Sequence, residues 1–361
     1  MKKNNKILWN KILQQDLEYI VTSAKKDLNF LSKKKVLFTG GCGFIGYYFY
    51  NSICLWNEKF KNKKIKYTIL DNVKQKPFWL NKKNCNFINR DISNLKTSFF
   101  EKFEIIIHGA SIASPTYYRK YPINTMKANV LGLWKILESL KKKNKKKVLF
   151  FFSSSEVYGD PDKKFIPTSE NYTGNVSFTG PRACYDESKR FGETLVVNYS
   201  KFYKFKCVIV RPFNNYGPGM RLNDKRVLPD IMKNVLGNKD IVLYSDGSPK
   251  RTFCYVADAI IGYLKALNSG KDRGIYNIGA KGPQISMNVL AKHVLRISKK
   301  ITSYNRKIIF KKNNEKNYLT DNPNRRCPDM KKTKKELNFS AKVRLEKGLY
   351  NLLIYYLNFK K

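Results

Sequence analysis

The sequence predicts an α/β protein built on a doubly wound parallel sheet, and three observations lead to this fold class. Short apolar runs, among them KVLFTG, EIIIHGA and KCVIVRPFN, alternate with longer amphipathic segments. These runs lack the polar alternation of a half-exposed strand, which is typical of parallel strands buried on both faces. A glycine-rich turn, TGGCGFIG, follows the first run and precedes a helical segment, as in dinucleotide-binding folds.

The chain divides into three parts. Residues 1–33 are expected to form a helical extension that packs on the body or on a second subunit. Residues 34–215 hold most strand-forming runs and are assigned to a dinucleotide-binding Rossmann domain, with a return segment near 240–265. Residues 216–361 are assigned mainly to a smaller mixed α/β lobe that binds substrate. The extension is expected to be helical because apolar residues repeat at Trp9, Ile12, Leu13, Leu17, Ile20, Val21 and Ala24.

The composition is that of a folded protein outside the membrane and without a metal site. Hydrophobic residues make up 42% of the 361 residues, and no apolar run approaches the roughly 18 to 20 residues of a membrane-spanning helix. The N-terminal stretch lacks the features of a signal peptide, so we expect a cytoplasmic protein. The seven cysteines form no C-x-x-C pair and only His108 and His293 accompany them, which predicts reduced, mostly buried thiols.

The formal net charge of +44 raises the question of a nucleic-acid partner, because basic proteins neutralise phosphates. The lysines are scattered along the whole chain, and the densest run, KKKNKKK at 141–147, belongs to no nucleic-acid-binding motif. We therefore expect no nucleic-acid partner. We attribute the charge to the composition of the source genome, with a benefit for solubility and for anionic substrates.

The glycine-rich turn predicts a dinucleotide site. Gly40 allows a tight turn, Gly43 lets backbone N–H groups approach a pyrophosphate, and Gly46 lets the helix lie close to its strand. The next strand ends in Asp71, whose carboxylate suits the adenosine ribose and repels a 2′-phosphate, so NAD is favoured over NADP. A structural turn followed by a strand-end aspartate is the alternative interpretation.

A second pair of motifs predicts acid–base chemistry. The stretch FFSSSEVYG places Ser154 at the carboxyl end of a strand, where ligands bind in such sheets. Tyr185 and Lys189 in GPRACYDESKR are one helical turn apart, and a nearby ammonium favours the phenolate form. We expect Tyr185 to take a proton from a substrate hydroxyl while hydride leaves for NAD⁺, with Ser154 holding that oxygen. Taken alone, a tyrosine and a lysine four residues apart would be two neighbours on an ordinary helix.

These motifs together resemble the extended short-chain dehydrogenase/reductases that act on nucleotide sugars. The resemblance covers nearly the whole chain from residue 35, through TGGCGFIG, HGASIASP, SSSEVYGDP, GPRACYDESKR, RPFNNYGPGM, RTFCYVADA and NRRCPDMKK. It implies the catalytic residues Ser154, Ser155, Glu156, Tyr185 and Lys189. It implies the NAD-binding residues Gly40, Gly43, Phe44, Ile45, Gly46, Asp71, Asn72, Asp91, Ile92, Ala110, Tyr185 and Lys189. It implies the substrate-binding residues Ser114, Arg182, Asn214, Arg226, Arg251 and Arg326.

The arginines in that set suit bidentate binding of a phosphate or a carboxylate. Arg251 is the candidate for such a contact because it lies inside a β-like apolar run. Arg182 could equally be a solvated surface charge.

The residues after Ser154 bear on the reaction. By resemblance, dehydratases of the family carry Asp-Glu there, and an alcohol such as Ser155 is too weak an acid to replace that aspartate. The 4-epimerases usually lack the glutamate. Ser155-Glu156, with GPRACYDESKR and MRLNDKRV, resembles the UDP-glucuronate decarboxylases, which make UDP-xylose. In these enzymes oxidation at C4 yields a β-keto acid, CO₂ leaves, and NADH returns its hydride.

Three features depart from the decarboxylase pattern. Ile112 and Ser188 stand where those enzymes tend to have proline and glycine, and the extension before residue 33 is outside the common core. Epimerisation at C4 or 4,6-dehydration of another nucleotide hexose, in surface-polysaccharide synthesis, therefore stays as the alternative. An inactive binding protein is disfavoured because Ser154, Tyr185 and Lys189 are all present.

The resemblance also implies a homodimer, formed by two helices from each subunit. The helices that follow residues 124 and 184 are the candidates. An apolar stripe on the first of them would either join the dimer or pack against the sheet, and it consists of Val130, Leu133, Ile136, Leu137 and Leu140.

Overall fold

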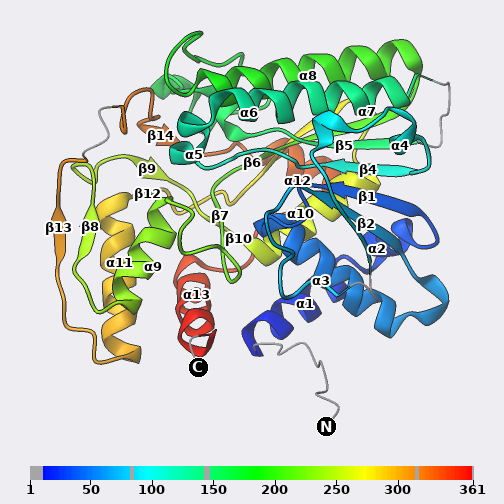
Figure 1. Cartoon of the computed structure of the whole chain (residues 1–361). Coiled ribbons are helices and arrows are strands. Elements are labelled where there is room, and N and C mark those ends of the chain that lie inside the picture. Colours follow the sequence, from blue (N-terminus) through cyan, green and yellow to red (C-terminus); the bar gives the residue numbers. More distant parts are fainter. Residues whose placement is uncertain (1–10, 82–84, 142–146, 314–316, 360–361) are drawn as a thin grey trace.

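A seven-stranded parallel sheet organises the molecule (Figure 1). The computed structural model describes residues 11–81, 85–141, 147–313 and 317–359. The strand order is β11-β6-β5-β4-β1-β2-β3, and every neighbouring pair is parallel. The predicted fold class is therefore confirmed. The strands are β1 (Lys35–Thr39), β2 (Lys66–Asp71), β3 (Asn86–Asn89), β4 (Ile105–His108), β5 (Val148–Phe152), β6 (Lys206–Pro212) and β11 (Gly274–Ile278).

Helices cover both faces of this sheet (Figure 1), as its apolar strands require. One face packs against α1 (Lys11–Ser23), α2 (Lys25–Leu31), α3 (Phe44–Lys59) and α10 (Val256–Ser269). The other face packs against α4 (Ser98–Glu101), α7 (Leu133–Ser139) and α8 (Ala183–Tyr203). A π-helical segment (Lys127–Gly132) joins α6 (Pro122–Met126) to α7. Leu133, Ile136, Leu137 and Leu140 are buried in this second core, so they are the sheet-facing stripe.

The N-terminal extension packs on the body of the same chain. Leu17 and Ile20 are fully buried, and α1 lies against α3 and α10. The Asp16 carboxylate accepts hydrogen bonds from the hydroxyls of Tyr48 and Tyr255, at 2.9 and 2.7 Å. Trp9, which belongs to the predicted stripe, lies outside the described residues, as do residues 142–146 of the lysine-rich run.

A smaller lobe follows the sixth strand of the sheet. Residues 241–243, within the return segment expected near 240–265, pair with β13 in this lobe, whereas α10 and β11 rejoin the large sheet. The lobe's helices are α9 (Val227–Leu236), α11 (Met287–Ile301) and α13 (Leu345–Phe359), whereas α12 (Lys331–Leu337) packs against α10 and β11. Its strands are β8 (Ile241–Leu243), β9 (Lys250–Arg251), β12 (Ile285–Ser286), β13 (Ile308–Phe310) and β14 (Arg325–Arg326). A short pair, β7 (Asn215–Tyr216) and β10 (Cys254–Tyr255), links the two regions.

The cysteines and the helices agree with two of the expectations from composition. All seven cysteines are free thiols and six of them are buried. Among the described residues, no helix combines the length and the hydropathy needed to cross a membrane.

Candidate active site

A large cleft lies at the carboxyl ends of the parallel strands, where α/β folds bind their ligands. Its volume of about 1290 Å³ exceeds the roughly 300 to 1,000 Å³ of a site for one small molecule. The cleft can therefore hold a dinucleotide and a second ligand together. Every residue that the sequence analysis predicted to act in catalysis, to bind NAD or to bind substrate lines this cleft.

The glycine-rich turn fits a dinucleotide pyrophosphate. Gly40 has a φ of +74°, and a Cβ there would lie 2.7 Å from the backbone of Ala110. A Cβ on Gly46 would lie 2.3 Å from the Gly41 carbonyl oxygen, whereas one on Gly43 would meet only the Gly40 oxygen, at 3.3 Å. Gly43 is the N-cap of α3, so the first N–H groups of that helix, from Phe44 and Ile45 onward, have no helical partner. Backbone donors and open space at a helix N-terminus suit a phosphate.

The carboxylate of Asp71 stands beside this turn. Its oxygens accept hydrogen bonds from the backbone N–H groups of Cys42 and Asn72, each at 2.8 Å. Burial raises the pKa of Asp71, and these two donors oppose that effect. The Asn72 side chain donates to Asp91 at 3.0 Å. The edge of the cleft therefore presents fixed oxygen acceptors that suit the hydroxyls of an adenosine ribose.

Tyr185 and Lys189 come from the first two turns of α8 and face the end of β5. The Lys189 ammonium donates to the Phe152 carbonyl at 2.8 Å and lies 5.8 Å from the centroid of the Tyr185 ring. Burial raises the pKa of Tyr185 to about 12, and its hydrogen bond with Ser154 opposes that rise. The Tyr118 ring stacks on Tyr185, with centroids 5.0 Å apart. The structure thus brings Ser154, Tyr185 and Lys189 into one buried group.

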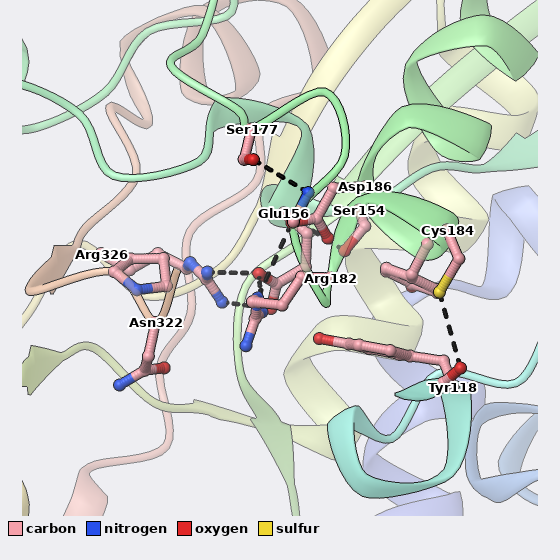
Figure 2. Close-up of polar contacts among 12 residues, drawn as sticks. Tyr118, Ser154, Glu156, Ser177, Arg182, Cys184, Asp186, Asn322 and Arg326 are labelled. Carbon is pink, nitrogen blue, oxygen red and sulfur yellow. Dashed lines mark hydrogen bonds and ion pairs between the residues drawn. The ribbon is translucent and has the colours of Figure 1, made fainter. Parts of the chain in front are cut away.

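Glu156 lies between two guanidinium groups (Figure 2). Its carboxylate accepts hydrogen bonds from Arg182, at the start of α8, and from Arg326 of β14. Burial opposes the ionisation of Glu156, but the two arginines hold its pKa at about 2. The arginine side chains are only 4% and 7% exposed. Arg182 is therefore buried in an ion pair, which rules out a solvated surface charge.

Asp186 completes this group, and the sequence analysis did not single it out. Its Oδ2 atom lies 3.7 Å from Arg182 Nε (Figure 2). Burial and the charge of Glu156 raise the pKa of Asp186 to about 8. Four buried polar atoms here have no hydrogen-bond partner among the described residues: Tyr118 Oη, Arg182 Nε, Asp186 Oδ1 and Arg326 Nε. Such atoms in one place leave room for a polar ligand or for water.

Arg251 differs from Arg182 and Arg326, the other buried arginines of the cleft, because it forms no ion pair with an acid among the residues that the structure describes. Its guanidinium donates to the backbone carbonyls of Lys250 and Asn324, at 2.8 and 3.2 Å, and to that of Pro323. Burial, and then the charge of Arg326, lower the pKa of Arg251. The group is held at the wall of the cleft by backbone carbonyls, and the charges of Glu156 and Asp160 act on it without a direct ion pair.

The three remaining substrate candidates also line the cleft. Asn214 donates to the Thr252 carbonyl at 3.0 Å, and Ser114 Oγ donates to the Asp224 carbonyl at 2.6 Å. Arg226 pairs with the Asp224 carboxylate.

Tyr118 and Asp186 are the site residues that the sequence analysis missed. Asp186 carries a weak signal, since it is an acid in the first turn of a helix and four residues after Arg182. Tyr118 carries none, because its ring reaches Tyr185 from α5 (Pro115–Lys120) through tertiary packing.

Comparison with known proteins identifies the family. The family described as "NAD dependent epimerase/dehydratase family" matches residues 36–279. The chain is 34% identical to UDP-glucuronic acid decarboxylase 6 of Arabidopsis thaliana, over 89% of this chain and 88% of that protein. The chain belongs to the NAD-dependent epimerase/dehydratase family. The family that the motifs indicated is thus confirmed.

Two further proteins extend the comparison. UDP-glucuronic acid decarboxylase 1 of Xenopus tropicalis is 32% identical over 95% of this chain and 77% of its own length. Among solved structures, UDP-glucose 4-epimerase of Thermotoga maritima with UDP-glucose superposes with a TM-score of 0.76 at 24% identity, covering 91% of this chain and 100% of that one. That structural likeness supports the fold alone.

Proposed function

We propose that this enzyme binds NAD and converts UDP-glucuronate to UDP-xylose and CO₂. The observation that carries the proposal is the ionised Glu156 held between Arg182 and Arg326 beside Tyr185. The sequence relatives named UDP-glucuronic acid decarboxylases support the same reaction.

The charge balance of the cleft favours an acidic sugar. Arg182, Arg251 and Arg326 are buried cations, and Glu156 is the acid that compensates them at neutral pH, because Asp186 has a raised pKa. Buried charges are stable only when they are paired, so the arginines favour an anionic ligand. A uronic acid carboxylate and a diphosphate together supply that charge.

The redox residues act on the C4 hydroxyl in this proposal. Tyr185, as phenolate, takes the hydroxyl proton, and Ser154 holds the same oxygen by a hydrogen bond. Lys189 stabilises the phenolate by its charge. NAD⁺, when bound along Gly40–Gly46 and Asp71, supplies the oxidising power by accepting hydride from C4.

The carboxylate end of the sugar then reacts. A ketone at C4 is β to the carboxylate on C5, so the C5–C6 bond breaks, CO₂ leaves, and the electron pair enters an enolate. The enolate is protonated at C5. We assign Arg182 and Arg326 to orienting the carboxylate, and the Glu156 carboxylate to relaying a proton from water to C5. Reduction of the 4-ketone restores the cofactor, and no external oxidant is consumed.

Product analysis tests the reaction. Purified protein is incubated with UDP-glucuronate, UDP-glucose, UDP-N-acetylglucosamine and dTDP-glucose, and the products are identified by mass spectrometry. We expect loss of CO₂ from UDP-glucuronate alone. An isomer of unchanged mass would indicate 4-epimerisation instead, and loss of water would indicate dehydration. Either result would replace the decarboxylase proposal.

We also propose that two chains form a homodimer through α8 and the helix that runs from α6 to α7. The sheet-facing stripe is unavailable for this contact, because it is already buried. The opposite side of the same helices exposes apolar residues that a partner would cover. They are Ile123, Met126, Leu131, Trp134 and Phe191. Light scattering that detected only monomer at micromolar concentration would contradict the dimer.

The division of labour between the lobes is part of the proposal. Residues 34–215 would hold NAD and the redox residues, and residues 216–361 would supply most substrate contacts, including Arg226, Arg251 and Arg326.

A further inference from the structure

One face of α8 carries a third functional candidate after Tyr185 and Lys189. Glu193 lies one turn beyond Lys189, so the three side chains recur every four residues on one face. Lys189 Nζ donates to the Phe152 carbonyl at 2.8 Å, and Ser153 Oγ donates to Glu193 Oε1 at 2.5 Å. The lysine and the glutamate therefore hold two consecutive residues of the β5 end, immediately before Ser154.

A buried arginine fixes Glu193 in place. Arg211 of β6 donates to both Glu193 oxygens, from Nε at 2.8 Å and from Nη2 at 2.6 Å. Its Nη1 donates to the hydroxyl of Tyr158 at 2.7 Å. Tyr158 ends the 3₁₀ segment Ser155–Tyr158, which carries Glu156. One ion pair thus ties α8, β5, β6 and that segment together.

Few groups carry charge near Lys189. From α8 it meets Tyr185 and Glu193, from β5 the Phe152 carbonyl and the Phe151 ring, and from β4 the His108 ring. Burial and then the charge of Lys189 lower the pKa of His108 to about 3, so that ring is neutral. Burial lowers the pKa of Lys189 to about 7, and the charge of Glu193 opposes this effect. Glu193 is therefore the one acid that acts on the lysine among the residues the structure describes.

We propose that Glu193 is a positioning residue of the redox centre, which locks the end of β5 against α8 and supplies the counter-charge that keeps Lys189 cationic. The proposal rests on the proposed function for the catalytic roles of Tyr185 and Lys189. Glu193 touches neither substrate nor cofactor in this assignment. It acts through Lys189 and through the placement of Ser154.

Residue-specific lysine titration tests the charge role without any substrate. The cofactor-free protein is labelled competitively with acetic anhydride across the neutral and alkaline range, and the extent at Lys189 is read by peptide mass spectrometry. In Glu193→Gln we expect the pKa of Lys189 to fall by about one pH unit, since a close opposite charge is lost. Glu193→Asp, which keeps the charge, should restore most of the wild-type value.

The matched control is Glu187→Gln, which removes an acid from a half-exposed position of the same helix, where it pairs with Arg190 at 3.5 Å. Its Lys189 titration should equal that of the wild type. If Glu193→Gln does not fold, adding Arg211→Gln removes the unpaired guanidinium. The Lys189 pKa should then fall by less, because the loss of a second cation partly offsets the loss of the acid. An unchanged Lys189 pKa in a folded variant, or an equal fall in Glu187→Gln, would overturn the proposal.

Single-turnover kinetics give a second readout. The rate of NADH formation from bound NAD⁺ and UDP-glucuronate is followed against pH. In Glu193→Gln the alkaline limb should move to lower pH by the same amount as the Lys189 pKa, because the ammonium is lost earlier. An unmoved limb beside a shifted lysine titration would overturn the link to catalysis. Absence of turnover in the wild type would instead count against the proposed function, and the titration would still decide the role of Glu193.

Discussion

Two buried ion-pair groups lie within one turn of α8 from the redox residues, and they differ in how completely they are paired. Glu193 and Arg211 satisfy each other through two hydrogen bonds, and Ser153 and Tyr158 take further contacts. In the Glu156 group, two arginines share one ionised acid, and several buried polar atoms have no partner among the described residues.

This difference indicates that the Glu193 group stabilises the fold and that the Glu156 group binds a ligand. A buried network whose polar atoms are all hydrogen-bonded holds the elements that meet in it in place. A network with unpaired polar atoms can instead form hydrogen bonds to a ligand. Glu156, Arg182 and Arg326 line the cleft, whereas Glu193 and Arg211 are not among its lining residues. We therefore expect changes to the Glu193 group to reduce stability most, and changes to the Glu156 group to reduce activity most.

Tyr185→Phe should give the largest effect and confine it to activity. The variant keeps the ring stacked on Tyr118 and deletes the ionisable oxygen. Hydride transfer should fall by about 10² to 10⁴, the range typical of lost acid–base catalysis, with NAD affinity retained. Stopped-flow absorbance of NADH and calorimetry of NAD⁺ binding measure the two quantities. Near-normal turnover would leave Tyr185 and Lys189 as two neighbours on a helix.

Arg211→Met should give the largest loss of stability. The change leaves the Glu193 carboxylate buried without its partner, which costs about 3–5 kcal/mol when a buried ion pair is broken. Arg182→Met should lower the free energy of unfolding less, because Arg326 still pairs with Glu156. Urea denaturation of the cofactor-free proteins compares the two. Equal losses would mean that the two groups do not differ as we infer.

Glu156→Gln should separate oxidation from decarboxylation. The amide cannot handle a proton at C5, so product formation should fall by about 10²-fold or more. Oxidation at C4 does not need that carboxylate, so absorbance of enzyme-bound NADH should rise when UDP-glucuronate is added. Product formation and NADH absorbance are followed in the same reaction. Loss of both signals together would place Glu156 in the first step instead of the later one.

Sequence patterns predicted the residues of the cleft because many of them belong to short motifs. The glycine spacing, the strand-end Asp71 and the Tyr185 to Lys189 step each depend on residues that are close in the chain. The Glu193 to Arg211 pair depends on α8 and β6 lying side by side, which no local pattern specifies. Glu193 itself was within reach, since it continues the four-residue step of Tyr185 and Lys189.

The apolar stripe after residue 124 was ambiguous for a different reason. A helical spacing of apolar residues marks a buried face but does not name its partner. The structure assigns Leu133 and Ile136 to the sheet, and leaves Trp134 and Ile123 on the outer face. The contact of Tyr118 with Tyr185 was likewise invisible, because both rings are placed by tertiary packing.

Asp186→Asn should have the smallest effect on activity, and its effect should appear in the pH dependence of stability. The pKa of Asp186 is about 8 in the folded protein and 3.8 is its ordinary value, so the folded state binds this proton more tightly. That contribution to the free energy of unfolding is fully present below the ordinary pKa and is lost as pH rises to about 8. Asparagine cannot titrate, so the stability of the variant relative to wild type should rise between these values.

Glu156→Gln should show the opposite sign at lower pH, because the pKa of Glu156 is depressed to about 2 and its contribution is lost as pH falls. Urea midpoints measured across the pH range, with Glu187→Gln as the half-exposed control, test both slopes. Parallel curves for wild type and Asp186→Asn would show that Asp186 is ionised in the folded protein, and that the Arg182 group is better paired than its geometry indicates.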